Sequence, residues 1–150
     1  MPDFDPAPAH KFFSAHCFNR AWELIDKPKR TPEENEQMIQ RTIASLWHWT
    51  QREDCTDQNL SIGYWQAARV YTLAGEPDNA RKYAKLCLDI TPADDAFCLG
   101  YAHEAMARAE ALAGNDELAN EHLELARALA TQIEKAEDRK LLEDDLAALA

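Results

Sequence analysis

The chain has 150 residues, enough to bury a hydrophobic core of its own, and 46% of them are hydrophobic. Its 27 acidic and 16 basic residues give a formal net charge of -11, which disfavours contact with the phosphate groups of nucleic acids and with anionic membranes. No apolar run approaches the roughly 20 residues that a membrane-spanning helix requires. These properties favour a folded protein that binds neither nucleic acid nor a membrane.

The cysteines and the first residues of the chain predict a cytoplasmic protein. Cys17, Cys55, Cys87 and Cys98 are widely spaced, with no C-x-x-C pair and no histidine at zinc-ligand spacing. The opening sequence MPDFDPAPAHKFF has no basic region followed by an apolar stretch, so we expect no signal peptide. We therefore expect reduced thiols, with Cys55 in a loop as the accessible one, and no bound metal.

Helical spacing of apolar residues, with capping signals between the segments, predicts about seven helices and an all-α fold. The first helix covers residues 10–26, with Ala15, Phe18, Trp22 and Ile25 at helical spacing as the apolar stripe that we expect to be buried. Thr31, Pro32 and Glu34 have the pattern of a capping box with proline at the first helical position, so a second helix begins there and runs to about residue 52. The helices expected after it cover residues 59–74, 77–90, 95–113, 116 to about 130, and 137–149.

An internal repeat with an offset of 39 residues relates the middle of the chain to its later part. The stretch YTLAGEPDNARKYAKLCL superimposes on AEALAGNDELANEHLELA, and each contains a helix, a glycine turn and a second helix. Gly75 corresponds to Gly114, both typical of helix C-caps, and Ala80 corresponds to Ala119. One such hairpin cannot bury its apolar face alone, so we expect neighbouring copies to stack.

The first copy contains, in order, a large aromatic, a close-packing pair, a second aromatic, small residues and a closing proline: Tyr64, Ala67, Ala68, Tyr71, Gly75, Ala80, Ala84 and Pro92. This pattern resembles the tetratricopeptide repeat (TPR), and the resemblance is clearest over residues 59–130. It implies a single domain over residues 1–150 that forms a short right-handed array of antiparallel hairpins. The degenerate first hairpin would cover 10–52, the TPR-like hairpins 59–92 and 96–131, and a capping helix 137–149.

The second predicted helix contains the sequence SLWHWTQRED, in which two tryptophans flank a histidine. A helical wheel defines an apolar stripe at Ile39, Ile43, Leu46 and Thr50. Trp47 and Trp49 lie on the two sides of this stripe, so we expect both to widen one buried face. His48 points away from them, on the face of Arg41 and Arg52, and we expect it in solvent.

The TPR resemblance implies a concave groove lined by the first helix of each hairpin. The residues that we assign to it are His16, Arg20, Glu23, Trp65, Arg69, Tyr101, Glu104 and Arg108. Arg69 and Arg108 are 39 residues apart and occupy equivalent positions, and Arg20 fits the same role. Arginines at such positions could pair with carboxylates or phosphates of an anionic partner, with the aromatics as apolar anchors. Alternatively, Arg69 pairs internally with a groove acid such as Glu104 or Glu23.

Catalytic patterns are not found in the sequence. The stretch HEAMA lacks the second histidine of H-E-x-x-H, and no G-x-S-x-G, P-loop or dinucleotide-binding glycine pattern occurs. His103 replaces an aromatic at a packing position, which favours an interior histidine with a hydrogen-bond partner. We therefore assign no catalytic residue, no metal and no cofactor.

These features favour a non-catalytic module that binds a protein or peptide partner in its groove. Two alternatives stay open. One is a homodimer formed through an exposed aromatic face. The other is a small-molecule or enzymatic pocket built around His16 and the arginines.

Overall fold

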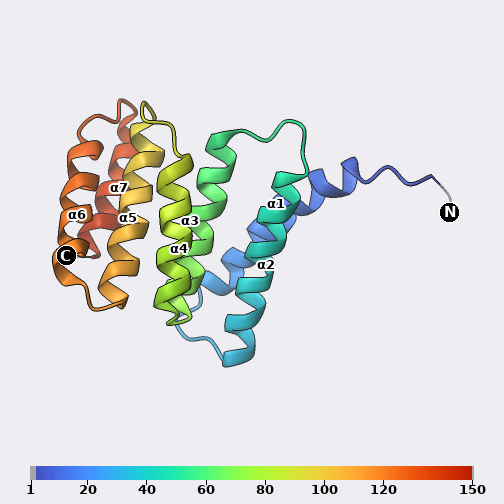
Figure 1. Cartoon of the computed structure of the whole chain (residues 1–150), viewed down its shortest axis with the longest axis horizontal. Helices are drawn as coiled ribbons and strands as arrows, with labels where there is room; N and C mark the ends of the chain where they lie inside the picture. Colours follow the sequence, from blue (N-terminus) through green and yellow to red (C-terminus); the bar gives the residue numbers. More distant parts are fainter. Residues whose placement is uncertain (1–2, 150) are drawn as a thin grey trace.

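The computed structural model describes residues 3–149 and contains seven α-helices and no strand over that range. The helices are α1 (Ala7–Ile25), α2 (Pro32–Thr50), α3 (Asp57–Leu73), α4 (Pro77–Ile90), α5 (Ala96–Leu112), α6 (Asp116–Ala130) and α7 (Ala136–Ala147). They form antiparallel hairpins that follow one another in chain order, from α1–α2 to α5–α6, with α7 added at the end (Figure 1). The structure confirms the predicted all-α array of hairpins.

Local sequence signals set the helix ends. The hydroxyl of Thr31 accepts from the backbone N–H of Glu34, and the Glu34 carboxylate accepts from the N–H of Thr31, so the predicted capping box is confirmed. Thr56 and Asn59 form a second box at the start of α3, which begins two residues before its predicted start. α1 begins at Ala7 because prolines are tolerated in a first helical turn.

The two glycine turns of the repeat have the same backbone geometry. Gly75 has φ 77° and Gly114 has φ 82°, the left-handed conformation that glycine adopts without steric cost. After each glycine, the next N–H bonds back over the helix end, from Glu76 to the carbonyl of Tyr71 and from Asn115 to that of Glu110. The same 39-residue offset therefore relates two helix-capping turns with equivalent backbone conformation and hydrogen bonds.

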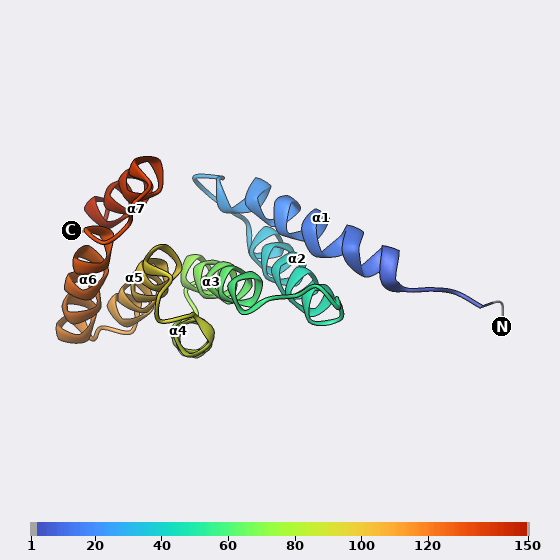
Figure 2. The same cartoon turned by 90° about the horizontal axis from the view of Figure 1, so that it is seen from above.

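The array is curved because one layer of helices is close-packed and the other is not. Helix α3 contacts both α1 and α5, and α5 contacts α7. Within residues 3–149, the even-numbered helices α2, α4 and α6 make no such contact with one another. The odd-numbered helices therefore lie on the concave side, and Figure 2 shows α1 and α7 flanking α3 and α5 with α4 on the opposite side.

Small residues allow the central helices to approach closely. Ala68, Ala80, Ala84, Ala105 and Ala109, all fully or almost fully buried, form the contact between α3, α4 and α5. A second cluster, with Met38 and Val70 at its centre, joins α1 and α2 to α3.

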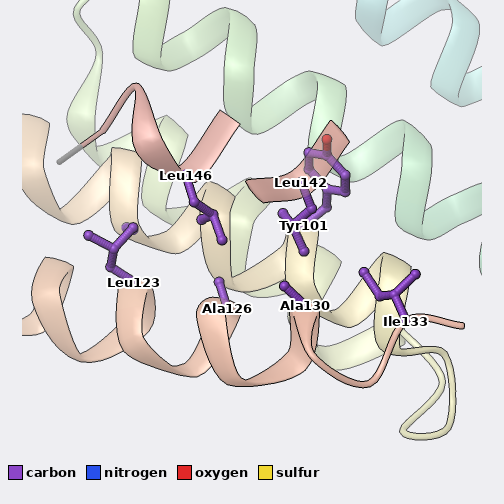
Figure 3. Close-up of a cluster of buried hydrophobic side chains, with 8 residues drawn as sticks. Tyr101, Leu123, Ala126, Ala130, Ile133, Leu142 and Leu146 are labelled. Atoms are coloured by element: carbon purple, nitrogen blue, oxygen red, sulfur yellow. The ribbon is translucent and has the colours of Figure 1, made fainter. Parts of the chain in front are cut away.

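The third cluster joins α5 and α6 to α7 around Tyr101, Leu142 and Leu146 (Figure 3). The link between α6 and α7 is fixed by Arg139, whose Nε and Nη2 donate to the carbonyl of Ile133 at 3.0 and 2.8 Å. In the described part of the chain, no helix has the combination of length and apolar character that crossing a bilayer would demand.

The face of α2 that is buried differs from the predicted one. The buried residues are Met38, Thr42, Ser45 and Leu46, so the stripe starts one position before Ile39. Trp47 is consequently 54% exposed and does not belong to the core. Trp49 is half-buried beneath the Arg52 guanidinium, whose Cζ lies 3.9 Å from the centre of its ring.

Candidate functional site

A cavity of about 330 Å³ opens on the concave side of the array, between α1, α3, α5 and α7. The residues around it, called the aromatic pocket below, are Phe18, Trp22, Ser61, Ile62, Trp65, Phe97, Cys98, Tyr101, Leu141 and Asp145. Each of the four helices contributes at least two of them, so the pocket exists only in the assembled array. Its volume is at the lower end of the range for ligand sites, about 300 Å³ and above.

The aromatic rings stand at steep angles to one another. The centroids of Trp65 and Tyr101 are 5.5 Å apart with the planes at 77°, and those of Phe97 and Tyr101 are 5.1 Å apart at 71°. Trp22 extends the wall from α1, 5.8 Å from Trp65. Trp65 and Phe97 thus pack edge-to-face on Tyr101, so the position of each ring depends on that of its neighbours.

The polar edges of two of these rings are bonded to carboxylates. The Trp65 indole Nε1 donates to Oε2 of Glu104 over 2.8 Å, and the Tyr101 hydroxyl donates to Oδ2 of Asp145 over 2.7 Å. Burial, and then the hydrogen bond to the Asp145 carboxylate, raise the pKa of Tyr101 well above its ordinary value. The phenol therefore stays neutral, and a hydrogen bond at its polar edge holds each of the two rings in place.

Behind Trp65 lies a charged cluster centred on Glu104, which is only 1% exposed. Arg108 Nε donates to Oε1 of Glu104, and Arg69 Nη1 lies 3.8 Å from the same oxygen. Burial, and then the nearby Arg108 charge, lower the pKa of Arg69. The Nε of Arg69 is buried without a hydrogen-bond partner in the described structure. The space enclosed by this cluster has no room for a water molecule.

Five of the eight residues assigned to the groove come together. Trp65 and Tyr101 line the aromatic pocket, and Arg69, Glu104 and Arg108 form the cluster behind it. The internal pairing of Arg69 with Glu104, which the sequence left as an alternative, is present.

The three groove residues assigned to α1 are in neither group. Arg20 pairs with Glu23 on the exposed surface, with Nε 3.3 Å from Oε2, and Arg41 of α2 lies 3.9 Å from the same carboxylate oxygen. His16 is exposed and stacks on Phe12. The side chains of α1 that reach the pocket are Phe18 and Trp22.

The reason is the register of α1, which is shifted by one position. Its buried face contains Ser14, Ala21, Leu24 and Ile25 instead of a stripe through Phe18 and Trp22. One residue corresponds to about 100° of rotation, so the two aromatics turn from the predicted core into the groove. The signal that could have shown this is the pair Ser14 and Ala21, because small residues seven apart are typical of a face that packs closely.

Two pairs of histidines bridge the helices of their hairpins. The Nδ1 atoms of His10 and His48 are 2.8 Å apart, so His48 is packed against α1 and is not the solvent-facing residue expected from the sequence. Burial, and then the proximity of His10, lower the pKa of His48. His103 and His122 form the second pair, with their Nδ1 atoms 3.0 Å apart and their rings stacked. His103 is thus a half-buried residue with a hydrogen-bond partner, as its sequence position predicts.

No histidine lines the aromatic pocket, and over residues 3–149 no group of three or more His, Cys, Asp or Glu side chains is arranged to hold a metal ion. Of the cysteines, Cys87 and Cys98 are buried, and Cys98 forms part of the pocket wall. The candidate site is therefore an aromatic pocket with one charged residue, Asp145, in its wall.

Comparison with known proteins does not assign the chain to a family. No protein-family model matches it, and neither a curated protein nor a solved structure does.

Proposed function

We propose that the protein is a binding module that takes a segment of a partner protein on its concave side, with one side chain of that segment in the aromatic pocket. The observation that carries the proposal is the pocket itself, a cavity of about 330 Å³ with rings from α1, α3 and α5. Interfaces derive most of their binding energy from a few anchor side chains that fill such pockets, particularly where aromatic residues surround them.

A relationship to the TPR superfamily belongs to the same proposal. It is supported by the 39-residue repeat, by the identical glycine turns at Gly75 and Gly114, and by the position of the pocket on the first helices of the hairpins. In helical arrays of stacked hairpins, the concave surface is the one used for extended partners.

The small-molecule alternative built around His16 has less support. His16 is exposed and is not among the residues that line the pocket, and Arg69 and Arg108 form ion pairs with Glu104 instead of lining the pocket. In the proposed function, the aromatic residues bind the partner and the arginines have a structural role.

The test is selection from a phage-displayed library of random peptides on the immobilised protein. Two exposed apolar residues at the pocket, Ile62 (39% exposed) and Leu141 (53% exposed), can be changed together to alanine without removing a buried group. A matched control changes Leu118 (41% exposed) and Leu125 (49% exposed), on the outer helix α6, to alanine.

We expect selected peptides to bind the Ile62→Ala/Leu141→Ala variant about ten-fold more weakly than the wild type, the loss of about 1.4 kcal/mol. Their affinity for the Leu118→Ala/Leu125→Ala variant should be unchanged. Circular dichroism of both variants checks that the helical array is intact. If the library yields no peptide whose binding depends on Ile62 and Leu141, the proposed function is wrong.

A further inference from the structure

We infer that the side chain received by the aromatic pocket is a lysine or an arginine, and hence that the partner segment is basic. This rests on the proposed function and adds the chemical class of the ligand. The aliphatic stem of the side chain would lie against the rings, and its charged end would reach the carboxylate of Asp145.

The charge of the pocket wall is the first argument. Asp145 is the single charged residue among the ten that line the cavity, and the wall contains no lysine, arginine or histidine. The whole chain has a net charge of -11, so its field attracts cations and repels anions at a distance. Both the local and the long-range charge therefore favour a basic segment.

The arrangement of the rings is the second argument. The positive edges of Trp65 and Tyr101, the indole N–H and the phenol O–H, are directed at carboxylates. With these groups engaged, neither ring offers an N–H or O–H donor to an anion in the cavity. The face of an aromatic ring attracts a cation placed over it, so a lysine or arginine that enters beside these rings gains an attraction that an anion does not.

The cluster behind Trp65 argues against an anionic side chain. An acidic partner would need a guanidinium group such as that of Arg69 or Arg108, which lie beside Trp65 in this cluster. Both are bonded to or close to Glu104, and the space around them admits no water molecule. An anion in the cavity would instead meet the like charge of Asp145, without a cation beside it in the wall.

The polarity of the cavity is the fourth argument. A lysine or arginine side chain is mostly apolar along its length, with a single charged end, and buries its stem while the head stays near a polar group or water. The cavity is divided in the same way, because apolar residues such as Phe18 and Leu141 line its walls and Asp145 provides one carboxylate. A purely apolar side chain would leave Asp145 facing it without a new partner, which costs free energy.

The experiment uses the peptides selected on the wild-type protein. Each peptide that depends on Ile62 and Leu141 is resynthesised with its shared basic residue replaced by an uncharged analogue. Citrulline replaces arginine, and norleucine, which keeps the four-carbon stem, replaces lysine. Affinities are measured by calorimetry for the wild type and for Asp145→Asn. Asparagine keeps an oxygen that can accept from the Tyr101 hydroxyl, so this variant removes the charge and preserves the hydrogen bond.

We expect the uncharged analogue to bind the wild type about ten-fold more weakly than the basic peptide, and the same replacement to change affinity for Asp145→Asn by less than about three-fold. Affinity of the basic peptide should also fall as salt is raised from about 0.05 to about 0.5 M. Pocket-dependent peptides that share an apolar or acidic residue, or equal affinity of the uncharged analogue, would overturn this inference and leave the proposed function standing. A selection without pocket-dependent peptides would overturn both.

Discussion

Trp65 and Glu104 occupy equivalent positions in successive hairpins, 39 residues apart, and they are bonded to each other through the indole Nε1 and a carboxylate oxygen 2.8 Å away. The repeat therefore brings one position of α3 into contact with the same position of α5. The acid is buried and accepts hydrogen bonds from Trp65 and Arg108, and Arg69 lies within ion-pair distance of it. It orients the largest ring of the aromatic pocket and neutralises one of the two guanidinium groups.

Glu104→Gln should destabilise the protein by about 2–4 kcal/mol, because it leaves two largely buried guanidinium groups without a counter-charge. The amide has nearly the shape of the carboxylate, so packing is preserved and the loss is electrostatic. Urea denaturation followed by circular dichroism measures it. The control is Glu124→Gln, which removes an exposed acid paired with Arg127 and should not measurably change the free energy of unfolding. Equal stability of the two variants would show that Arg69 and Arg108 do not need Glu104.

The histidine pair of the third hairpin replaces a tyrosine pair of the second. Tyr64 and Tyr83 face each other between α3 and α4, and 39 residues later His103 and His122 stack between α5 and α6. Burial lowers the pKa of both imidazoles below the ordinary value of 6.5, and the charge of one disfavours protonation of the other, whereas Glu110 and Glu121 act in the opposite direction on His122. The two Nδ1 atoms can share a hydrogen only if at least one ring is neutral.

As pH falls below about 6.5, the unfolded chain therefore binds protons at these histidines before the folded chain does, and the free energy of unfolding decreases. Above that pH both states are neutral here and the pair contributes no pH dependence. The double variant His103→Tyr/His122→Tyr, which copies the preceding hairpin, should flatten the stability profile between pH 7 and pH 5 relative to the wild type. Denaturation curves across this range test the difference, and parallel profiles for the two proteins would contradict it.

Periodicity and capping were sufficient to predict the helices, because each of these signals is local. Thr31 with Glu34, and the glycines at 75 and 114, act within one turn of the chain, and the structure has them as predicted. The repeat also related α3 to α5. For that reason the sequence assigned to one groove the five residues that the structure brings together, which are Trp65, Arg69, Tyr101, Glu104 and Arg108.

The residues that α1 and α7 contribute to the pocket could not be predicted in the same way. In α1, the aromatic residues were assumed to be buried, whereas the helix packs on the small Ser14 and Ala21 and turns its rings to the groove. Asp145 and Leu141 belong to α7, which lies outside the repeat, so no register relates them to the earlier helices. Their position in the pocket depends on how α7 packs on α5. This contact is long-range, so the spacing of apolar residues within α7 does not predict it.

The four cysteines should differ in reactivity according to burial. Burial raises the pKa of Cys87 to about 11 and that of Cys98 to about 12, and both thiols are buried in the structure. Cys17 and Cys55 are half-exposed, and burial raises their pKa values too. We expect a thiol reagent at pH 8 to label Cys17 and Cys55 in the folded protein and the other two only after denaturation. Peptide mass mapping after brief labelling identifies the sites, and early modification of Cys87 would contradict the packing of α3 on α4.

The last prediction separates the structural role of α7 from its binding role through two adjacent leucines. Leu142 is fully buried beside Tyr101 (Figure 3). Leu141 is 53% exposed and lines the pocket. Leu142→Ala leaves a cavity in the core and should reduce the free energy of unfolding by about 2–5 kcal/mol. Leu141→Ala removes an exposed group, so stability should stay nearly constant while affinity for pocket-dependent peptides falls. Urea denaturation and calorimetric titration of both variants give the two quantities. If the two changes lowered stability equally, α7 would not pack on α5 through Leu142, and the pocket would lose its fourth wall.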